Sequence, residues 1–272
     1  MGIADRISDL QVQAKELAIG WLGNASFVLK TTSGTVAYID LYLSDLGERI
    51  YGKEFKRLMP PLLSASQVKA DILISTHHHE DHFDVDIIPE IMKSDDTLLA
   101  GTPTCMKVCR QMGIDDERLI ELRVGKEYSV KDMCLITVYA DHGDLAPDAV
   151  GVVLAIDETI VYITGDTAYR PKKLGPVKKL KPDIVILPIN GKFGNLNPSE
   201  AACLARDIEA KIAIPCHHWM FPALGGDPGA FMENIGKLAP NTRPVMLTLG
   251  EIFIHIKQNE GGENASRISS KP

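Results

Sequence analysis

The sequence of 272 residues lacks two features that would place a protein in or across a membrane. It has no run of about 18 or more apolar residues, so we expect no membrane-spanning helix and no membrane partner. The opening residues MGIADRISDL carry acidic side chains where a signal peptide has basic residues followed by an apolar run. These observations predict a cytoplasmic protein.

Cysteine and positive charge are also scarce. The five cysteines are odd in number and none are spaced as C-x-x-C, which favours free thiols in a reducing compartment. The formal net charge of -7 argues against a nucleic-acid partner, because phosphate binding depends on clustered lysine and arginine. The basic run at residues 170–181 is the local exception, and we interpret it as a solvated helix face.

The sequence does contain enough apolar residues, 45%, to bury a sizeable core. We predict a single domain over residues 1–257 and a polar, disordered tail over residues 258–272. Strands and helices mix along the chain, and many consecutive strands are joined by short turns. This order favours an α/β fold in which helices cover two sheets, an αββα four-layer sandwich, over one doubly wound sheet.

Some segments carry clear local signals. Apolar positions near helical spacing predict a leading helix within residues 3–17, and two β-rich runs around a Thr-Ser-Gly turn predict a hairpin over residues 18–43. Asn197 before Pro198 predicts the start of a helix. The runs PVMLTL and EIFIHIK near the end predict a closing pair of strands.

Metal-binding side chains are concentrated after four apolar runs, in the stretches STHHHEDHFD, YADHGD, ITGDTAY and IPCHHW. Seven of the eight histidines lie there, and only His255 lies elsewhere. His77 and His79 are two residues apart, so both side chains project to the same side of an extended chain. His142 can complete a three-ligand set with them, as a catalytic metal site requires.

A second set can begin in the same loop. Asp81 and His82 follow where the chain turns, and His217 can complete their set. Asp166 has two carboxylate oxygens and is therefore the natural bridge between the two sets. The sequence alone does not separate His217 from the adjacent His218 as the ligand.

The arrangement T-H-x-H-x-D-H at residues 76–82, followed by His142, G-D-T at 165–167 and P-x-H at 215–217, resembles the metallo-β-lactamase superfamily. The resemblance extends from about residue 19 to residue 257 and implies an αββα sandwich with a dinuclear metal site at one edge of its sheets. The stretches WLGNASFVLKT, HGDLAPDAVG, GDTAY and IPCHHWMFPALGGDP resemble the branch that contains L-ascorbate-6-phosphate lactonase.

This resemblance implies a hydrolase with two divalent metal ions, zinc or manganese, with iron as a further option. Such ions can lower the pKa of a water held between them, so that it attacks an ester or lactone carbonyl as hydroxide without a Ser or Cys nucleophile. Asp81 or Asp166 would then pass a proton to the leaving group. We expect a lactonase that acts on a small sugar-derived lactone, with or without a phosphate.

Two other activities and a non-enzymatic role remain open at this stage. Superfamily phosphodiesterases and nucleases use the same metals, although the net charge counts against RNA as a substrate. Diiron redox members carry Glu at the second position of the motif, where this chain has His79. A scaffold that only binds a partner would not need a complete set of metal-coordinating residues, and the complete set in this sequence counts against that role.

Further residues near the four stretches have two interpretations each. Asp40 ends an apolar run and either orients a ligand histidine or forms a turn. Asn190 and Lys192, with nearby Asn195, follow a buried strand where substrate loops occur, and Lys192 or Arg170 could receive a substrate phosphate or be an exposed loop cation. By alternation along the chain, His78 and Cys216 point away from their ligand neighbours. A homo-oligomer is possible.

Overall fold

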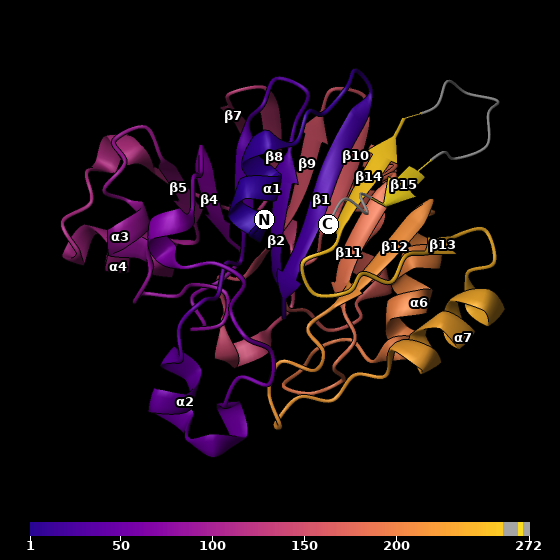
Figure 1. Ribbon diagram of the computed structural model, residues 1–272. Helices are drawn as coiled ribbons and strands as arrows, with labels where there is room; N and C mark the ends of the chain where they lie inside the picture. Colours follow the sequence, from indigo (N-terminus) through magenta and orange to yellow (C-terminus); the bar gives the residue numbers. More distant parts are fainter. Residues whose placement is uncertain (258–265, 269–272) are drawn as a thin grey trace.

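The computed structural model describes residues 1–257 and 266–268, which form two facing sheets (Figure 1). The first sheet has the strand order β15 (Ser266–Ile268), β14 (Ile252–Ile256), β1 (Glu16–Gly23), β2 (Ser26–Lys30), β3 (Val36–Ile39), β4 (Ile72–Ser75), β5 (Leu98–Gly101) and β6 (Leu119–Glu121). The second has the order β13 (Arg243–Pro244), β12 (Ile212–Cys216), β11 (Ile184–Pro188), β10 (Thr159–Ile163), β9 (Val150–Ile156), β8 (Met133–Tyr139) and β7 (Glu127–Val130).

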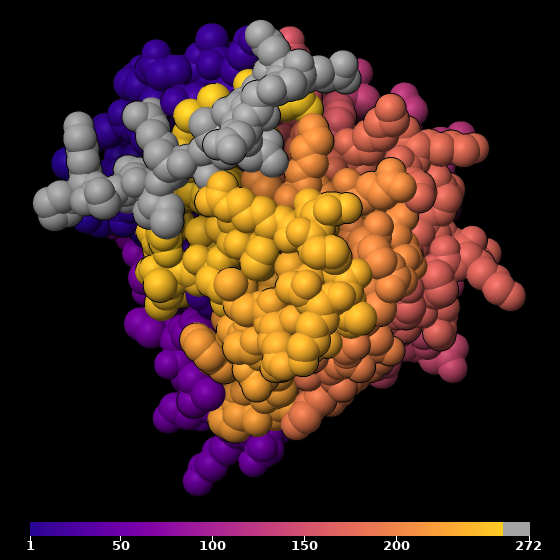
Figure 2. Space-filling model, turned by 90° about the vertical axis from the view of Figure 1, so that its right-hand side faces the viewer, coloured from indigo at the N-terminus to yellow at the C-terminus, as the bar shows by residue number. Residues whose placement is uncertain are grey.

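Helices cover the outer face of each sheet. The first sheet carries α1 (Ile3–Asp9), α3 (Ile88–Ile91) and α4 (Pro103–Gln111), and the second carries α5 (Gly175–Leu180), α6 (Pro198–Asp207) and α7 (Pro228–Leu238). A further helix, α2 (Leu46–Tyr51), lies beyond the lower edge of the sheets in Figure 1. Figure 2 shows the side of the molecule on which α7 lies, where the orange and yellow later segments of the chain form the visible face.

Three apolar layers hold this arrangement together. Strand β1 illustrates why, because Ile19 and Trp21 point into the layer between the sheets while Ala18 and Leu22 point towards the helices. A strand that is covered on both faces is mostly apolar, and all eight residues of β1 are buried, with Glu16 at its start as the one charged residue. The predicted αββα sandwich is therefore confirmed.

The directions of the strands bring the predicted site together. Strands β3 and β4 are parallel, as are β10, β11 and β12. Strand β8 is antiparallel to β9, which is antiparallel to β10, so β8 runs in the same direction as β10. The chain consequently leaves β3, β4, β8, β10 and β12 at the same ends of their sheets, at the lower edge in Figure 1.

Several local predictions need correction. The leading helix, Ile3–Asp9, lies within the predicted range, but residues 18–43 form three strands instead of one hairpin, because a turn at Asn24, with φ of 51°, separates β1 from β2. The closing strand pair is wrong: β13 pairs with β12 of the second sheet, whereas β14 pairs with β1 of the first. Of the run PVMLTL only Pro244 lies in a strand, β13, which pairs in the second sheet, and the chain then crosses to the first sheet, where EIFIHIK contributes β14.

The predicted start of one helix is confirmed. Helix α6 begins after Asn197, whose side chain accepts hydrogen bonds from the backbone N–H groups of Ser199 and Glu200. Within the predicted disordered tail the structure describes Ser266–Ile268, as β15, and the rest of that tail lies outside the described residues. Among the helices of the described chain, none combines the length and apolar character needed to cross a bilayer.

A buried carboxylate, Asp183, pairs with two lysines just before β11, at the end of that strand remote from the predicted site. The Asp183 carboxylate accepts hydrogen bonds from the Lys211 ammonium at 3.0 Å, the Lys257 ammonium at 2.6 Å and the backbone N–H of Ile160 at 3.0 Å. Burial alone would raise the pKa of Asp183, but these donors outweigh burial and lower it. Asp183 is therefore an ionised group whose charge is matched inside the fold.

Candidate metal-binding active site

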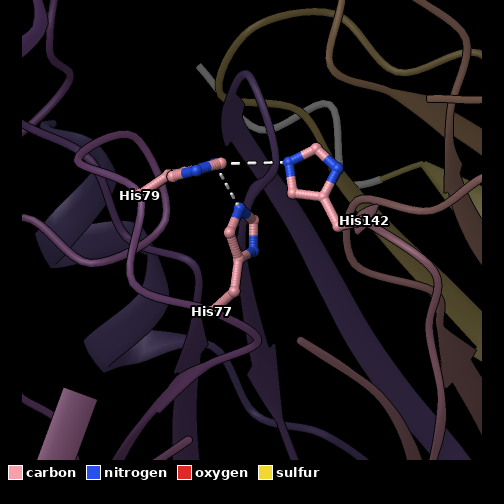
Figure 3. Close-up of side chains that lie close together, drawn as sticks. All are labelled: His77, His79 and His142. Atoms are coloured by element: carbon pink, nitrogen blue, oxygen red, sulfur yellow. Dashed lines mark hydrogen bonds between the residues drawn. The ribbon is translucent and has the colours of Figure 1, made fainter. Parts of the chain in front are cut away.

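Three histidine rings meet at the edge of the sandwich. His77 and His79 come from the loop after β4, and His142 comes from the loop after β8. Figure 3 shows the rings turned towards one another, with His79 Nδ1 lying 3.0 Å from His77 Nε2 and 3.3 Å from His142 Nε2. Three ring nitrogens thus converge on one point, as a tetrahedral metal site with one open position requires.

The outer contacts of two rings fix which nitrogen carries the proton. His79 Nε2 lies 3.1 Å from the backbone carbonyl of Leu145, which can only accept, so His79 Nδ1 has a free electron pair when the ring is neutral. His77 Nδ1 lies 3.1 Å from Thr76 Oγ1, and that hydroxyl donates its own proton to Asp40. His77 Nε2 therefore also faces the site without a proton.

The second predicted set also assembles. His217 Nε2 lies 3.1 Å from His82 Nε2 and 3.3 Å from Asp81 Oδ2. His82 donates from Nδ1 to Asp40 Oδ2 at 2.9 Å, which leaves its Nε2 facing the site. His217 follows β12 in the left-handed backbone region, with φ of 58°, and its backbone N–H donates to the carbonyl of Asn24.

Asp166 lies between the two sets. One carboxylate oxygen is 3.4 Å from His82 Nε2, and the other is 3.4 Å from His217 Nε2 and 3.7 Å from His142 Nε2. Asn195 donates to the second of these oxygens at 2.7 Å. This contact holds the carboxylate in place, so Asn195 supports Asp166 rather than facing a substrate loop.

Asp40 ties both sets to the first sheet. Its carboxylate accepts from the backbone N–H of Thr76 at 2.7 Å, from Thr76 Oγ1 at 2.8 Å and from His82. Asp40 is 1% exposed and has φ of 47°, a region that aspartate tolerates better than most residues. Of the two interpretations of Asp40, these contacts support the one in which Asp40 orients ligand histidines.

Two supporting residues were missed by the sequence analysis. Asn24 donates to Asp81 Oδ2 at 2.9 Å, and its backbone carbonyl receives the N–H of His217 and the indole N–H of Trp21. Thr76 links His77 to Asp40, as described above. The signal for Asn24 was available as the short Gly-Asn-Ala break within an apolar run, which marks a turn.

The chemistry of these residues fits bound metal ions. Burial lowers the pKa of His77, His79 and His142, with that of His142 reaching about 4, so their rings are neutral and can act as ligands. Free electron pairs on His77 and His79 that face each other at 3.0 Å repel unless a cation lies between them. The buried oxygen Oδ1 of Asp166 also has no hydrogen-bond partner.

The second set, Asp81, His82 and His217, lies in surroundings that stabilise a positive charge. Burial alone would lower the pKa of His82, but the carboxylates of Asp166, Asp40 and Asp81 outweigh burial and raise it to about 10. The pKa of His217 is raised as well, because Asp166 and Asp81 outweigh its burial. Carboxylate and imidazole groups in this combination suit zinc, manganese or iron.

The structure separates the adjacent residues that the sequence left open. His218 packs its ring on Trp21, with the ring centroids 5.1 Å apart, and it is not among the groups of side chains that could hold a metal. His78 is also outside these groups, and Cys216 is buried in the core between the sheets. In the described chain His217, and not His218, therefore faces the metal-binding groups.

A cavity of about 290 Å³ opens above the two sets. Its polar lining consists of Glu80 and of five predicted ligands, His79, Asp81, His142, Asp166 and His217. Asn190 and Lys192 are not among the described residues that line it, which differs from the prediction that they face the substrate. Lys192 instead donates to the backbone carbonyl of Ala223 at 3.0 Å, and Arg170 is paired with Asp141.

Comparison with known proteins gives a consistent result. A profile of the family described as "Beta-lactamase superfamily domain" matches residues 18–217. A UPF0173 metal-dependent hydrolase from Methanobrevibacter smithii is 27% identical over 259 residues, covering 89% of this chain and 99% of that protein.

Solved structures share the fold. Igni18, a metallo hydrolase from Ignicoccus hospitalis, superposes with a TM-score of 0.68 at 20% identity, covering 88% of this chain and 98% of the other. An isothiocyanate hydrolase from Delia radicum gut bacteria gives a TM-score of 0.69 at 19% identity, covering 86% and 97%. At such low identity these structures support the fold and carry no information about the substrate.

Proposed function

The chain belongs to the beta-lactamase superfamily. On that premise we propose that it is a metal-dependent hydrolase that opens an ester or lactone bond with water. The observation that carries the proposal is the convergence of six side chains into two sets joined by Asp166, at the floor of a cavity. Relatives named as metal-dependent hydrolases support it.

The first set, His77, His79 and His142, and the second set, Asp81, His82 and His217, would each hold one divalent ion, with Asp166 between them. Ions bound there would lower the pKa of a water and polarise a substrate carbonyl. Among the described residues that line the cavity there is no Ser, Thr or Cys. Water is therefore the natural nucleophile, which favours hydrolysis over a covalent acyl-enzyme route.

Asp166 and Asp81 can each transfer the proton of the attacking water. Burial alone would raise the pKa of Asp166, but His217, His82 and His142 outweigh it and lower the pKa, so the group is ionised at neutral pH. The pKa of Asp81 is also lowered, by His82, His217 and the hydrogen bond from Asn24, against the effect of burial. Either carboxylate can accept a proton from the attacking water and give it to the leaving oxygen.

The test is hydrolysis by the purified protein loaded with zinc or manganese, with metal content measured on the same sample. We expect lactone or ester hydrolysis that His142→Ala abolishes while the circular dichroism spectrum stays unchanged. Hydrolysis of bis-p-nitrophenyl phosphate alone would instead identify a phosphodiesterase. Redox-active iron with oxygen reduction would identify a redox protein, and no bound metal would leave only a binding role.

A further inference from the structure

One wall of the cavity is aromatic. Phe55 lies at its centre, with its ring centroid 5.6 Å from that of Phe221, 5.9 Å from that of Phe193 and 5.1 Å from that of Tyr51. All four rings line the cavity, and Leu145 and Leu224 extend the apolar surface. Apart from Glu80 and the hydroxyl of Tyr51, the part of the cavity beyond the predicted metal ligands is thus built from apolar groups.

This wall is a fixed part of the fold. Tyr51 and Phe55 belong to the segment 44–69 between β3 and β4, which is charged and contains the pair Pro60-Pro61. Backbone hydrogen bonds join that segment to the loop after β12, from Leu58 N–H to the carbonyl of Met220 and from Ala223 N–H to the carbonyl of Glu54, each 2.8 Å long. These bonds connect the segments that carry Phe55 and Phe221.

Cations that could bind an anionic substrate are missing from the cavity wall. Among its described lining residues there is no Lys or Arg; Lys192 lies outside the lining and donates to the carbonyl of Ala223, and the charge of Arg170 is paired with that of Asp141. Glu80 lines the cavity and accepts a hydrogen bond from the hydroxyl of Tyr51 at 2.9 Å. A phosphate or carboxylate remote from the reacting bond would therefore meet a carboxylate and aromatic rings.

We propose that the substrate is an uncharged ester or lactone whose alkyl or aryl substituent packs against the aromatic wall formed by Tyr51, Phe55, Phe193 and Phe221. This inference rests on the proposed hydrolase function and names its substrate class. A cavity of about 150 Å³ can hold benzene, so the 290 Å³ found here has room for a lactone ring with a short side chain. If the sugar-derived lactone expected from the sequence carried a phosphate, that phosphate would meet no Lys or Arg among the described residues that line the cavity.

Three γ-lactones test the substrate class in the metal-loaded protein. γ-Butyrolactone has no side chain, γ-nonalactone has a five-carbon chain, and the third lactone has the same chain ending in a carboxylate. Because burying each methylene favours binding, we expect kcat/KM for γ-nonalactone to exceed that for either of the others by at least about 10-fold. If the carboxylate-bearing lactone is hydrolysed as well as γ-nonalactone, the inference is wrong while the hydrolase function stands.

Variants test the wall itself. Phe193 is 47% exposed, so Phe193→Ala removes part of the wall without opening the core, and we expect it to lower the ratio of kcat/KM for γ-nonalactone over γ-butyrolactone by about 3- to 10-fold. Met232→Ala, on α7, truncates an apolar side chain that is 41% exposed and should leave the ratio unchanged. An unchanged ratio in Phe193→Ala contradicts the placement of the side chain.

A binding measurement separates this inference from the proposed function. 3-Pentylcyclopentanone is the carbon analogue of γ-nonalactone and cannot be hydrolysed, so its binding can be measured by calorimetry whether or not any lactone is opened. We expect it to bind at least about 10-fold more tightly than cyclopentanone, and Phe55→Ala to remove most of that difference. Equal binding of the two ketones by the wild-type protein would refute the apolar wall, whereas tight binding without any lactone hydrolysis would refute only the proposed reaction.

Discussion

Replacing Asp40 by asparagine should weaken metal binding although Asp40 is not itself a predicted ligand. The carboxylate accepts three hydrogen bonds, from Thr76 N, Thr76 Oγ1 and His82 Nδ1, at 2.7, 2.8 and 2.9 Å. An asparagine keeps one acceptor oxygen and places an NH₂ group where the other oxygen receives His82. His82 must then accept at Nδ1, and the proton moves to Nε2, the nitrogen that faces the site.

The size of the effect follows from that contact. A hydrogen bond to a charged group contributes about 1.5–3 kcal/mol, and about 1.4 kcal/mol corresponds to a tenfold change in affinity. We therefore expect Asp40→Asn to weaken zinc binding about 10- to 100-fold, which agrees with the usual effect of removing the partner of a ligand histidine. The measurement is zinc titration in competition with a chelator at fixed pH.

A matched control lies at the other end of β4. Asp71 also accepts a backbone N–H, from Val36 at 2.8 Å, but it precedes the strand while the ligands follow it. Asp71→Asn makes the same chemical change and should leave zinc affinity as in the wild type. If Asp40→Asn also binds zinc with wild-type affinity, Asp40 does not set the orientation of His82.

Three further predictions address the supporting structure. Gly165→Ala adds a Cβ 2.9 Å from that of Thr76 at φ of 60°, so the free energy of unfolding in urea should fall by at least about 1–2 kcal/mol; an unchanged value would show that the loop can move. Asn24→Ala removes the donor to Asp81, so kcat/KM should fall about 10-fold with metal present, and full activity would contradict that positioning role. The lowered pKa of Asp183 means that its ion pairs stabilise the fold above the unfolded pKa of about 3.9 and that this stability is lost as pH falls through the lower folded value. Asp183→Asn should therefore lower the melting temperature at pH 7 and reduce its dependence on pH between about 5 and 2, and an identical pH profile would refute the assignment.

The local chemistry of the site could be predicted from the sequence because it depends on residue types and short spacings. Polar side chains suited to metal binding follow apolar strands, and the alternation expected of an extended chain separated His77 and His79 from His78, although the chain bends at residues 76–79. The strand order, with many short turns, likewise predicted two covered sheets. These features need only neighbours along the chain.

Contacts between distant segments decided which of two adjacent histidines faces the site and which residue supports Asp81. Whether His217 or His218 faces the metal groups depends on a left-handed backbone at His217 and on Trp21, which lies in the other sheet and packs against His218. Asn24 reaches Asp81 across 57 positions of sequence, and no local pattern reports such a contact.

The substrate-facing surface is also a tertiary feature. The aromatic wall joins the segment 44–69, Phe193 and Phe221, each of which looks like an ordinary loop residue or excursion in the sequence. The sequence by itself determined the fold class and the candidate metal ligands, because the strand pattern and the residue types suited to metal binding can be recognised from neighbouring residues. Only the tertiary structure decided the orientation of those side chains and the apolar character of the cavity, because both arise from contacts between distant segments.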